Sequence, residues 1–332
     1  MKRLLLIALL LPLFSFSQTR TSVTDGNFWN PLTWTPVGLP TSGETVIINH
    51  DVVMDLDIWY TAGSITINVG GSLIEDATDR AFWVDGTGSL INNGTFTVNQ
   101  ILVSSGSTLA NTGDLANIDS LWNQGTFTSS GVSSIVDFLN DETATCTNTG
   151  TMNILNDMNN QGLFINTNTI DLVNDFSNCN VQTMDALFIN DGIFCIAADM
   201  TNCIDDTLAG SGDYFIGGSS SNFGVFDGTH TFHTPSGTIG IPGTVESGVT
   251  VTTGSCTLEL ESGVFDYSFY PNPTTDKIQL SITGANYQLY ASTGKLLMDG
   301  TIENYQIDLT NLEQGVYILL VEGSTGKRLI KQ

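Results

Sequence analysis

The chain has 332 residues, of which 41% are hydrophobic and 13% charged, and its formal net charge is −25. This balance argues against binding to nucleic acid and to anionic membranes, because both reward basic surface. A disordered acidic chain is also excluded, since the apolar residues are retained and the polar remainder is mostly Asn, Thr, Ser and Gly.

The N-terminus has the pattern of a signal peptide over residues 1–17. Lys2 and Arg3 form a positive start, and the apolar stretch 4–14 is too short to span a bilayer. A small-aromatic-small sequence then offers a cleavage site, so the mature chain is expected to begin at Gln18. We expect no membrane-spanning segment in the mature chain, because no later segment approaches about 18 apolar residues.

The cysteines are Cys146, Cys179, Cys195, Cys203 and Cys256. Export permits disulfides, and the odd number leaves at least one thiol unpaired within the monomer. There is no CxxC sequence, which argues against a zinc knuckle or a thioredoxin-type site. We expect mostly buried, small apolar side chains with one bridge.

Residues 21–262 contain short strands and turns and no convincing amphipathic helix. Apolar residues alternate with Thr, Ser and Asn, and Gly and Asn-Gly interrupt the alternation. The interruptions share one frame: Asn, any residue, Gly, any residue, then usually an apolar residue. The frame occurs at 92–98, 111–117, 123–129, 148–154, 160–166 and 190–196, and at 166–172 with Asn168 in place of Gly.

This frame predicts a repeating coil. Four successive Gly-to-Gly separations are 19, 12, 25 and 12, which cluster near one or one-half of a coil of about 24 residues. Asn168 suggests that the Gly position needs a left-handed backbone, which Asn tolerates next best. The predicted fold is all-β: a right-handed parallel β-helix over 18–262, with about 10–12 coils of about 20–24 residues.

In such a solenoid, inward Val, Ile, Leu and Phe form the core, and Asn at the corners is expected to form ladders from coil to coil. Two antiparallel β-sandwiches are the alternative, because they use the same strand chemistry. The segment 26–55 resembles the first coil of secreted bacterial parallel β-helix proteins. Phe28, Trp29 and Trp34 are the bulky residues that would cover the end of the solenoid as a cap.

The amino-acid composition changes near residue 263, and we place a domain boundary between Glu261 and Phe265. Between Arg80 and Lys277 the chain has no Lys or Arg over 196 residues. Prolines, aromatics and bases then gather in the last part of the chain, as in "YPNP" (270–273), "YQLYASTGKLL" (287–297) and "GVYILLVEGSTGKRLIKQ" (315–332).

With these motifs in this order, residues 266–332 resemble the type A C-terminal sorting domain of type IX secretion cargo. About seven short alternating strands predict a small antiparallel, Ig-like β-sandwich. The sorting-motif residues are Tyr270, Pro271, Asn272, Pro273, Gly294, Lys295, Gly315, Val316, Tyr317, Lys327 and Lys331.

The individual residues make further predictions for this domain. Pro271 and Pro273 should fix an extended first strand, and Gly294 and Gly315 should lie at turns. In the strand after Gly315, apolar residues occupy both faces, which predicts burial on both sides.

The resemblance implies a route rather than a chemistry. The signal peptide would deliver the chain to the periplasm, and the outer-membrane translocon would recognise the tail. The product would then be secreted, or held at the cell surface on lipopolysaccharide. Sorting domains of this type are carried by enzymes, adhesins and inert proteins alike.

Candidate chemistry in the cargo is sparse. His230 and His233, three residues apart, lie on opposite faces of a strand and do not suit a shared metal; His50 is the other histidine. The acidic candidates for calcium or acid–base chemistry are Asp205-Asp206, Asp141-Glu142 and the group Asp51, Asp55 and Asp57. None matches a calcium loop, so we expect solvated acids and no cofactor, with calcium as the alternative.

A polysaccharide lyase is disfavoured, because residues 81–276 hold 21 acidic residues and no base to neutralise a uronate. Trp59, Tyr60, Trp83, Trp122, Tyr214 and Phe223 are candidates for stacking on neutral sugars. The predicted function is a non-catalytic surface or extracellular solenoid for adhesion or structure, with partners in extracellular polysaccharide. A carbohydrate-binding module and a hydrolase of neutral polysaccharide are the alternatives, and exposed Trp or Tyr clustered on one flat face would favour binding.

Overall fold

The computed structural model describes residues 18–76, 78–180, 184–240, 243–254, 268–291, 295–302, 304–321 and 327–332. The chain divides between Thr257 and Leu258 into two compact units, and each is described by itself. The predicted signal peptide and the predicted boundary between Glu261 and Phe265 lie outside the described residues. Within the described residues, no helix is long and apolar enough to cross a membrane.

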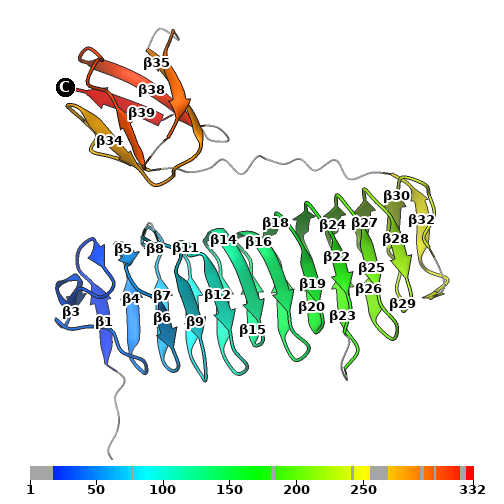
Figure 1. The fold of residues 1–332 in the computed structure, drawn as a ribbon. Coiled ribbons are helices and arrows are strands. Elements are labelled where there is room, and N and C mark those ends of the chain that lie inside the picture. The colour runs from blue at the N-terminus through cyan, green and yellow to red at the C-terminus, as the bar shows by residue number, and fades with distance from the viewer. Residues whose placement is uncertain are drawn as a thin grey trace, which may run out of the picture. The chain divides into compact units, whose positions relative to one another are not determined.

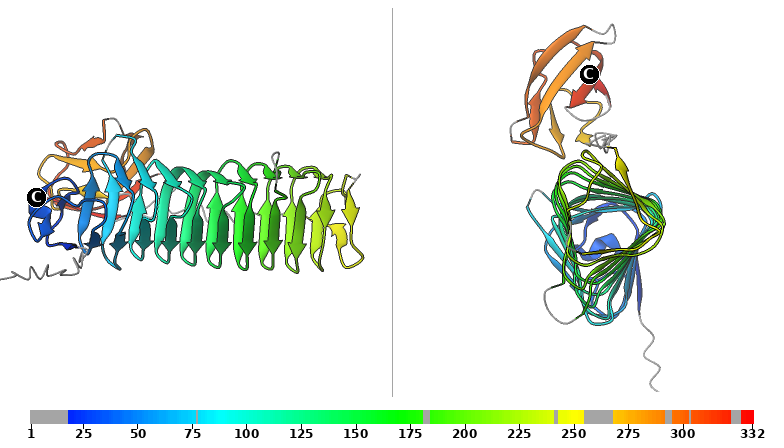
Figure 2. Two further views of the ribbon diagram at one scale, coloured as in Figure 1. Left: turned by 90° about the horizontal axis from the view of Figure 1, so that it is seen from below. Right: turned by 90° about the vertical axis from the view of Figure 1, so that its right-hand side faces the viewer.

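The first unit is a parallel β-solenoid of about 11 turns (Figure 1), so the predicted β-helix is confirmed and the antiparallel sandwich alternative is wrong. A full coil contributes three strands, and the strands of successive coils pair in parallel to form three stacks. The left panel of Figure 2 shows the coils side by side along the axis.

Stack 1 consists of β1 (Thr19–Ser22), β4 (Thr45–Ile48), β7 (Ser64–Ile67), β10 (Ser89–Asn92), β13 (Thr108–Asn111), β15 (Thr126–Ser129), β17 (Thr145–Asn148), β20 (Leu163–Asn166), β23 (Leu187–Asn190), β26 (Thr207–Gly210), β29 (Val225–Phe226) and β31 (Thr244–Val245). Stack 2 consists of β2 (Gly26–Asn27), β5 (Asp51–Met54), β8 (Ser72–Glu75), β11 (Thr95–Thr97), β14 (Asp114–Asn123), β16 (Val132–Asn140), β18 (Thr151–Ile154), β21 (Thr169–Leu172), β24 (Ile193–Ile196), β27 (Asp213–Ile216), β30 (Thr231–Thr234) and β32 (Thr250–Thr253). Stack 3 consists of β6 (Ile58–Tyr60), β9 (Ala81–Val84), β12 (Gln100–Val103), the later parts of β14 and β16, β19 (Met158–Asn160), β22 (Phe176–Asn178), β25 (Met200–Asn202) and β28 (Ser220–Asn222).

Strand alternation explains why these sequences form a solenoid. Most strands have a buried residue at every second position, and the buried positions of neighbouring coils are paired in register. In stack 1, for example, Phe127, Cys146 and Phe164 follow one another along the axis and are fully buried. Because each coil buries its apolar side chains against the coils above and below, the interior is one continuous core. The right panel of Figure 2 looks along this interior.

Several coils are shorter than predicted. Hydrogen-bonded Asn residues on adjacent coils lie 17 to 20 residues apart at most steps, and 24 apart from Asn166 to Asn190 and from Asn178 to Asn202. The coil of about 24 residues that the Gly separations indicated is therefore too long at most steps, whereas four of these eight steps fall within the predicted range of about 20–24 residues. The longer steps share the loop between β22 and β23.

Buried asparagines form two ladders, which confirms the expectation of Asn ladders at the corners. One ladder closes stack 1 with Asn92, Asn111, Ser129, Asn148, Asn166 and Asn190, and the other closes stack 3 with Asn123, Asn140, Asn160, Asn178, Asn202 and Asn222. Within a ladder each amide nitrogen typically donates to the amide oxygen of the next coil, as from Asn160 to Asn178 at 2.7 Å. An amide suits this position because it is both donor and acceptor, whereas buried carboxylates would repel one another.

The repeated Gly has a different cause from the one predicted. Gly94, Gly113, Gly150 and the equivalent Asn168 are not among the residues with positive φ, so the left-handed explanation is wrong. A Cβ built on Gly150 would lie 2.2 Å from the carbonyl oxygen of Gly131 in the preceding coil. Its N–H donates to the Oδ1 of Asn148 at 3.3 Å. The position thus needs a backbone that approaches the neighbouring coil closely.

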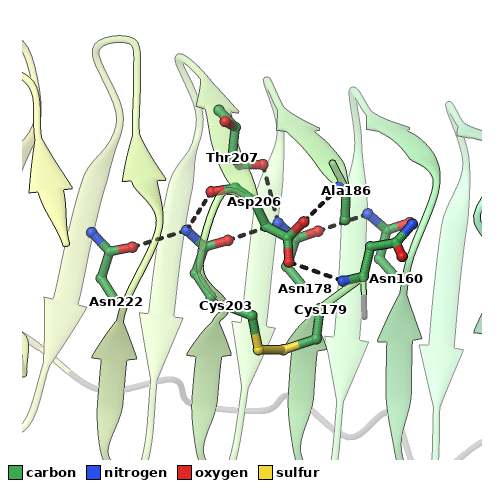
Figure 3. Close-up of a disulfide and its surroundings, with 10 residues drawn as sticks. Asn160, Asn178, Cys179, Ala186, Cys203, Asp206, Thr207 and Asn222 are labelled. Atoms are coloured by element: carbon green, nitrogen blue, oxygen red, sulfur yellow. Dashed lines mark hydrogen bonds between the residues drawn. A yellow bond between two sulfur atoms is a disulfide. The ribbon is translucent and has the colours of Figure 1, made fainter. Parts of the chain in front are cut away.

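A disulfide links two adjacent coils at the corner where the loop between β22 and β23 begins (Figure 3). Cys179 and Cys203 directly follow ladder residues Asn178 and Asn202, and their sulfur atoms are bonded. The carboxylate of Asp206 accepts hydrogen bonds from the N–H groups of Ala186, at 2.6 Å, and Asn180, at 2.9 Å. These contacts hold the loop that enlarges the coil.

The other cysteines differ in state. Cys195 is also disulfide-bonded, so the expectation of one bridge is wrong. Cys146 is a free, buried thiol, which confirms that one thiol stays unpaired. Burial raises the pKa of the Cys146 thiol well above its usual value. Cys256 lies outside the described residues.

The N-terminal end of the solenoid carries the expected aromatic cover. Phe28 and Trp34 are buried with edge-to-face rings 5.3 Å apart, and Trp29 packs against the same core. A short 3-10 helix, η1 (Pro31–Thr33), leads into β3 (Trp34–Thr35), which pairs antiparallel with β1. This pairing covers the free edge of stack 1.

The second unit has seven strands in its described residues, all paired antiparallel, as predicted. One sheet has the order β33 (Phe269–Tyr270), β34 (Lys277–Leu280) and β37 (Gln306–Asp308), and the other has β36 (Leu296–Thr301), β35 (Asn286–Ala291), β38 (Gly315–Val321) and β39 (Lys327–Lys331). Their facing side chains, such as Ile278, Ile307 and Leu319, form a second core.

Three local predictions for this unit are corrected. β38 is buried on one side only, since Val316 and Ile318 are exposed; the second sheet covers just one face of its sheet. The chain bends after Tyr270 instead of staying extended through Pro271 and Pro273, both of which follow cis peptide bonds. Gly315 begins β38 and is not a turn residue, while Gly294 lies outside the described residues.

Candidate functional site

An apolar stripe runs along the outward side of stack 3. The side chains at one register position on five consecutive coils are Trp59, Trp83, Leu102, Trp122 and Leu139, which we call the tryptophan stripe. Trp59 is 62% exposed and Trp122 45%, whereas the other three are half-buried. Exposed indoles on one sheet face were the feature expected to favour binding over a purely structural role.

Both strongly exposed indoles are held in the same way. The Nε1–H of Trp59 donates to the Oδ2 of Asp85 at 3.2 Å, and that of Trp122 donates to the Oδ2 of Asp141 at 3.1 Å. In each case the carboxylate belongs to the next coil. Trp59 also makes an edge-to-face contact with Trp83, with ring centroids 5.6 Å apart.

The holding carboxylates are themselves fixed. Asp85 accepts a hydrogen bond from its neighbour Gly86 at 2.7 Å, and this bond and the Trp59 indole hold the pKa of Asp85 below its usual value. Asp141 accepts from the side chain of Gln124 at 3.0 Å. The lowered pKa keeps Asp85 ionised near neutral pH, and each of the two carboxylates accepts a hydrogen bond that orients one indole.

The residues that flank the stripe on both sides are polar, with the exception of Ala81. On one side the register positions two residues earlier are Asp57, Ala81, Gln100, Ser120 and Asp137. On the other side the positions two residues later are Thr61, Asp85, Ser104, Gln124 and Asp141. The stripe is thus one side chain wide and bordered by hydroxyl, amide and carboxylate groups.

The nearby charge is almost entirely negative. Arg80 is the base closest in sequence, and its guanidinium bonds to both carboxylate oxygens of Asp76, at 3.0 and 2.7 Å. Further along the axis, Asp137, Asp157, Asp175 and Asp199 form a column at the corner before stack 3. Each accepts a backbone N–H from the next coil, at 2.6 to 3.4 Å. The surface therefore repels polyanions.

His230 and His233 face opposite sides of the chain, as predicted from their spacing. His230 is fully buried beside Tyr214 and Phe232, whereas His233 points outward and stacks on Phe215 with ring centroids 4.3 Å apart. His50 contacts the hydroxyl of Ser22 through Nδ1 at 3.0 Å.

The acidic candidates serve separate structural contacts. Asp51 accepts from the hydroxyl of Ser72, Asp55 from the side chain of Asn27, and Asp57 from the N–H of Ala81. Asp205, with a φ of 70°, adjoins the loop-binding Asp206, and Glu142 donates its N–H to Asp141. In the described ranges, no group of three or more His, Cys, Asp or Glu side chains could hold a metal ion.

The remaining aromatic candidates lie elsewhere. Tyr60 and Tyr214 are core residues, so their prediction as sugar-stacking residues is wrong; both point inward because they occupy buried strand positions. Phe223 is exposed but follows β28, far along the axis from the tryptophan stripe.

The sequence did not identify Leu102, Leu139 and Asp85 as residues of the candidate site. The sequence separations along the stripe are 24, 19, 20 and 17 residues, so the true coil length would have aligned them. With a coil of about 24 residues assumed, the alignment is lost after the first step.

In the second unit, the first motif and the last strand are clasped together. The Nδ2 of Asn272 donates to the carbonyl of Arg328, and the Oδ1 of Asn272 accepts from the N–H of Ile330, both at 2.9 Å. Lys331 is buried and donates to the carbonyl of Thr275. "YPNP" therefore binds "KRLIKQ", 56 or more residues away in the chain.

The other sorting-motif residues lie around this clasp or apart from it. The hydroxyl of Tyr270 donates to Gln279 at 2.5 Å, and that of Tyr317 to the carbonyl of Glu313 at 2.6 Å. Lys295 is exposed before β36, and Lys327 begins β39. An open depression of about 440 Å³ is lined by Ser268, Phe269, Asn272, Lys327 and Arg328.

Comparison with known proteins separates the two units. A family model described as the secretion system C-terminal sorting domain matches residues 268–332. No curated protein and no solved structure matches the chain. The second unit thus carries a type IX sorting domain, which indicates a secreted cargo, and its route leads through the outer membrane to the medium or the cell surface.

Proposed function

We propose that this secreted cargo is a non-catalytic solenoid that binds neutral polysaccharide through the tryptophan stripe, in adhesion or in the structure of the extracellular surface. The observation that carries the proposal is the alignment of three Trp and two Leu side chains on one sheet face, with two indoles held outward by carboxylates. Flat apolar rings bordered by hydrogen-bonding groups suit the apolar faces and hydroxyl edges of sugars.

The charge around the stripe supports a neutral ligand. Residues 81–276 contain no Lys or Arg, and Arg80 is paired with Asp76. An anionic polymer would meet only repulsion from the carboxylates beside the stripe. Binding through the stripe should therefore be insensitive to added salt.

The carboxyl groups support binding rather than hydrolysis. Burial raises the pKa of Glu75 and of Asp206, as a general acid would require. Each of them, however, accepts a backbone hydrogen bond that holds a loop: Glu75 from Arg80 in its own loop at 2.8 Å, and Asp206 from Ala186 of the preceding coil at 2.6 Å. Their contacts are those of loop-closing residues.

The test is co-sedimentation of the full-length protein with insoluble cellulose, β-1,3-glucan, xylan and mannan, and with an alginate gel as the anionic control. We expect retention on at least one neutral polymer, no effect of salt, no retention on alginate, and no release of reducing sugar. Failure to bind every neutral polymer would refute the binding role, and release of sugar would refute the non-catalytic one.

A further inference from the structure

We infer that the tryptophan stripe binds one extended polysaccharide chain of neutral, equatorially linked sugar rings, lying along the solenoid axis with about one ring per coil. The inference rests on the proposed function and adds the direction, the length and the chemical class of the ligand. Four features of the stripe carry it: its direction, its end, its fixed indoles and its polar borders.

The direction follows from the register. Trp83, Leu102 and Trp122 are paired from strand to strand, so the apolar residues follow one another along the axis. Along each strand of stack 3, the outward neighbours of a stripe residue are polar, as with Ser120 and Gln124 around Trp122, except for Ala81 beside Trp83. A sugar chain parallel to the strands would meet one apolar side chain, whereas a chain along the axis meets five.

The length follows from where the stripe ends. From Trp59 to Leu139 there are four coil steps, or roughly 19 Å at the usual spacing of about 4.8 Å between strands. A sugar ring in an extended chain advances by about one such step, so the stripe accommodates about five rings. The next register position is Asn159, followed by Ser177, which give no apolar contact.

The exposed indoles are pre-organised for ligand binding by their hydrogen bonds. The Oδ2 atoms of Asp85 and Asp141 accept from the Nε1–H groups of Trp59 and Trp122, in each case from the next coil. The two pairs lie three coils apart. Fixing an exposed indole in this way lowers the entropy lost on binding. Exposed side chains of this size are otherwise costly to leave in water, and nothing in the core requires them.

The borders of the stripe select the chemistry of the sugar. Asp57, Gln100 and Ser120 on one side, and Ser104 and Gln124 on the other, offer acceptors and amide donors to hydroxyl groups. Carboxylates beside the stripe disfavour uronates and sulfated sugars by repulsion. The favoured ligand is therefore a neutral chain whose rings expose flat apolar faces.

The experiment is calorimetric titration of the full-length protein with soluble cello-, xylo-, manno- and laminari-oligosaccharides of two to seven units. For the oligosaccharide class that binds, we expect affinity to rise with each ring up to about five and then to stay constant. Trp59→Ala and Trp122→Ala should each weaken binding of the pentamer about 10-fold or more, although the two residues lie near opposite ends of the stripe. Asp141→Asn, which keeps the side-chain size, should weaken it by a smaller factor.

Thr201→Ala and Ser221→Ala are the matched controls, because they alter the same register position further along the same stack. They should leave binding unchanged. If a neutral oligosaccharide binds but affinity stops rising at two units, or if Trp59→Ala has no effect, the axial chain is refuted and the proposed function stands. If no neutral oligosaccharide or insoluble polymer binds at all, both fail.

Discussion

The two halves of stack 3 share one buried core but differ in their outward side chains, which are apolar in the first half and polar in the second. From β6 to β16 the inward residues include Phe82 and Phe138, and from β19 to β28 they include Phe176 and Asn202; all are buried. Outward, the same register position holds Trp or Leu in the first half and Asn159, Ser177, Thr201 and Ser221 in the second. The inward side is thus constrained by the fold, while the outward side is free to carry function.

The largest expected effect is the loss of export when the second unit is removed from a solenoid that folds without it. Truncation after Glu261 in the native host should abolish delivery of the cargo to the surface and the medium, since it removes the sorting domain matched at 268–332. The solenoid should still fold, because its core is separate. Immunoblotting of cell fractions measures this outcome, and truncated cargo at the surface or in the medium would refute the sorting role.

A sharper test uses two adjacent residues of β19 that face opposite ways. Asn160→Ala should lower the free energy of unfolding by about 3 kcal/mol, because it strands the buried amides of Asn140 and Asn178. Asn159→Ala, on the exposed side, should change it by less than about 0.5 kcal/mol. Denaturant unfolding measures both, and equal effects would contradict the division between inward and outward sides.

Histidines on the two sides of the C-terminal coils give a pH-dependent test. Burial lowers the pKa of His230 from its usual value of 6.5. The unfolded chain therefore binds a proton that the folded one resists, so stability should fall as pH drops below about 6.5, by up to about 1.4 kcal/mol per pH unit. This loss continues until the pH reaches the lowered pKa of the folded state.

The difference in stability between wild type and His230→Phe isolates this effect, because Phe suits the aromatic neighbours of His230. The wild type should lose stability relative to this variant on acidification. His233→Phe should leave the acid loss in place, since His233 lies outside the core. An acid loss that persists unchanged in His230→Phe would contradict the assignment.

The smallest expected effect comes from extending the stripe into the second half. Asn159→Trp places an indole at the next register position after Leu139. The length at which oligosaccharide affinity stops rising should move from about five rings to about six, with a gain of a few-fold. Thr201→Trp is the control and should not change that length, because polar residues occupy the register positions between it and the stripe.

Much of the fold could be predicted from the sequence because inward and outward residues alternate in nearly every strand. The coil length could not, because the Asn-x-Gly frame occurs at two different corners of the solenoid and is absent from some coils. Asn111 and Asn123 lie at the two corners of one coil, which produced the separation of 12. The separation of 25 arose because Ser129 occupies the ladder position where the frame expects Asn.

The candidate site was predictable only in part for the same reason. Composition identified Trp59, Trp83 and Trp122 as sugar-stacking candidates, but equally Tyr60 and Tyr214, which the strand register turns into the core. Aromaticity alone carries no information about which side of a strand a residue takes. Knowledge of the coil length and of each corner is needed to assign that side.

The most direct measurement is intrinsic tryptophan fluorescence during titration with the neutral oligosaccharide that binds. We expect a saturable change in the wild type and in Thr201→Ala/Ser221→Ala. We expect none in Trp59→Ala/Trp122→Ala, whose thermal midpoint should stay within a few degrees of the wild type. Full binding by the folded Trp59→Ala/Trp122→Ala variant would show that the tryptophan stripe is not the ligand-binding surface.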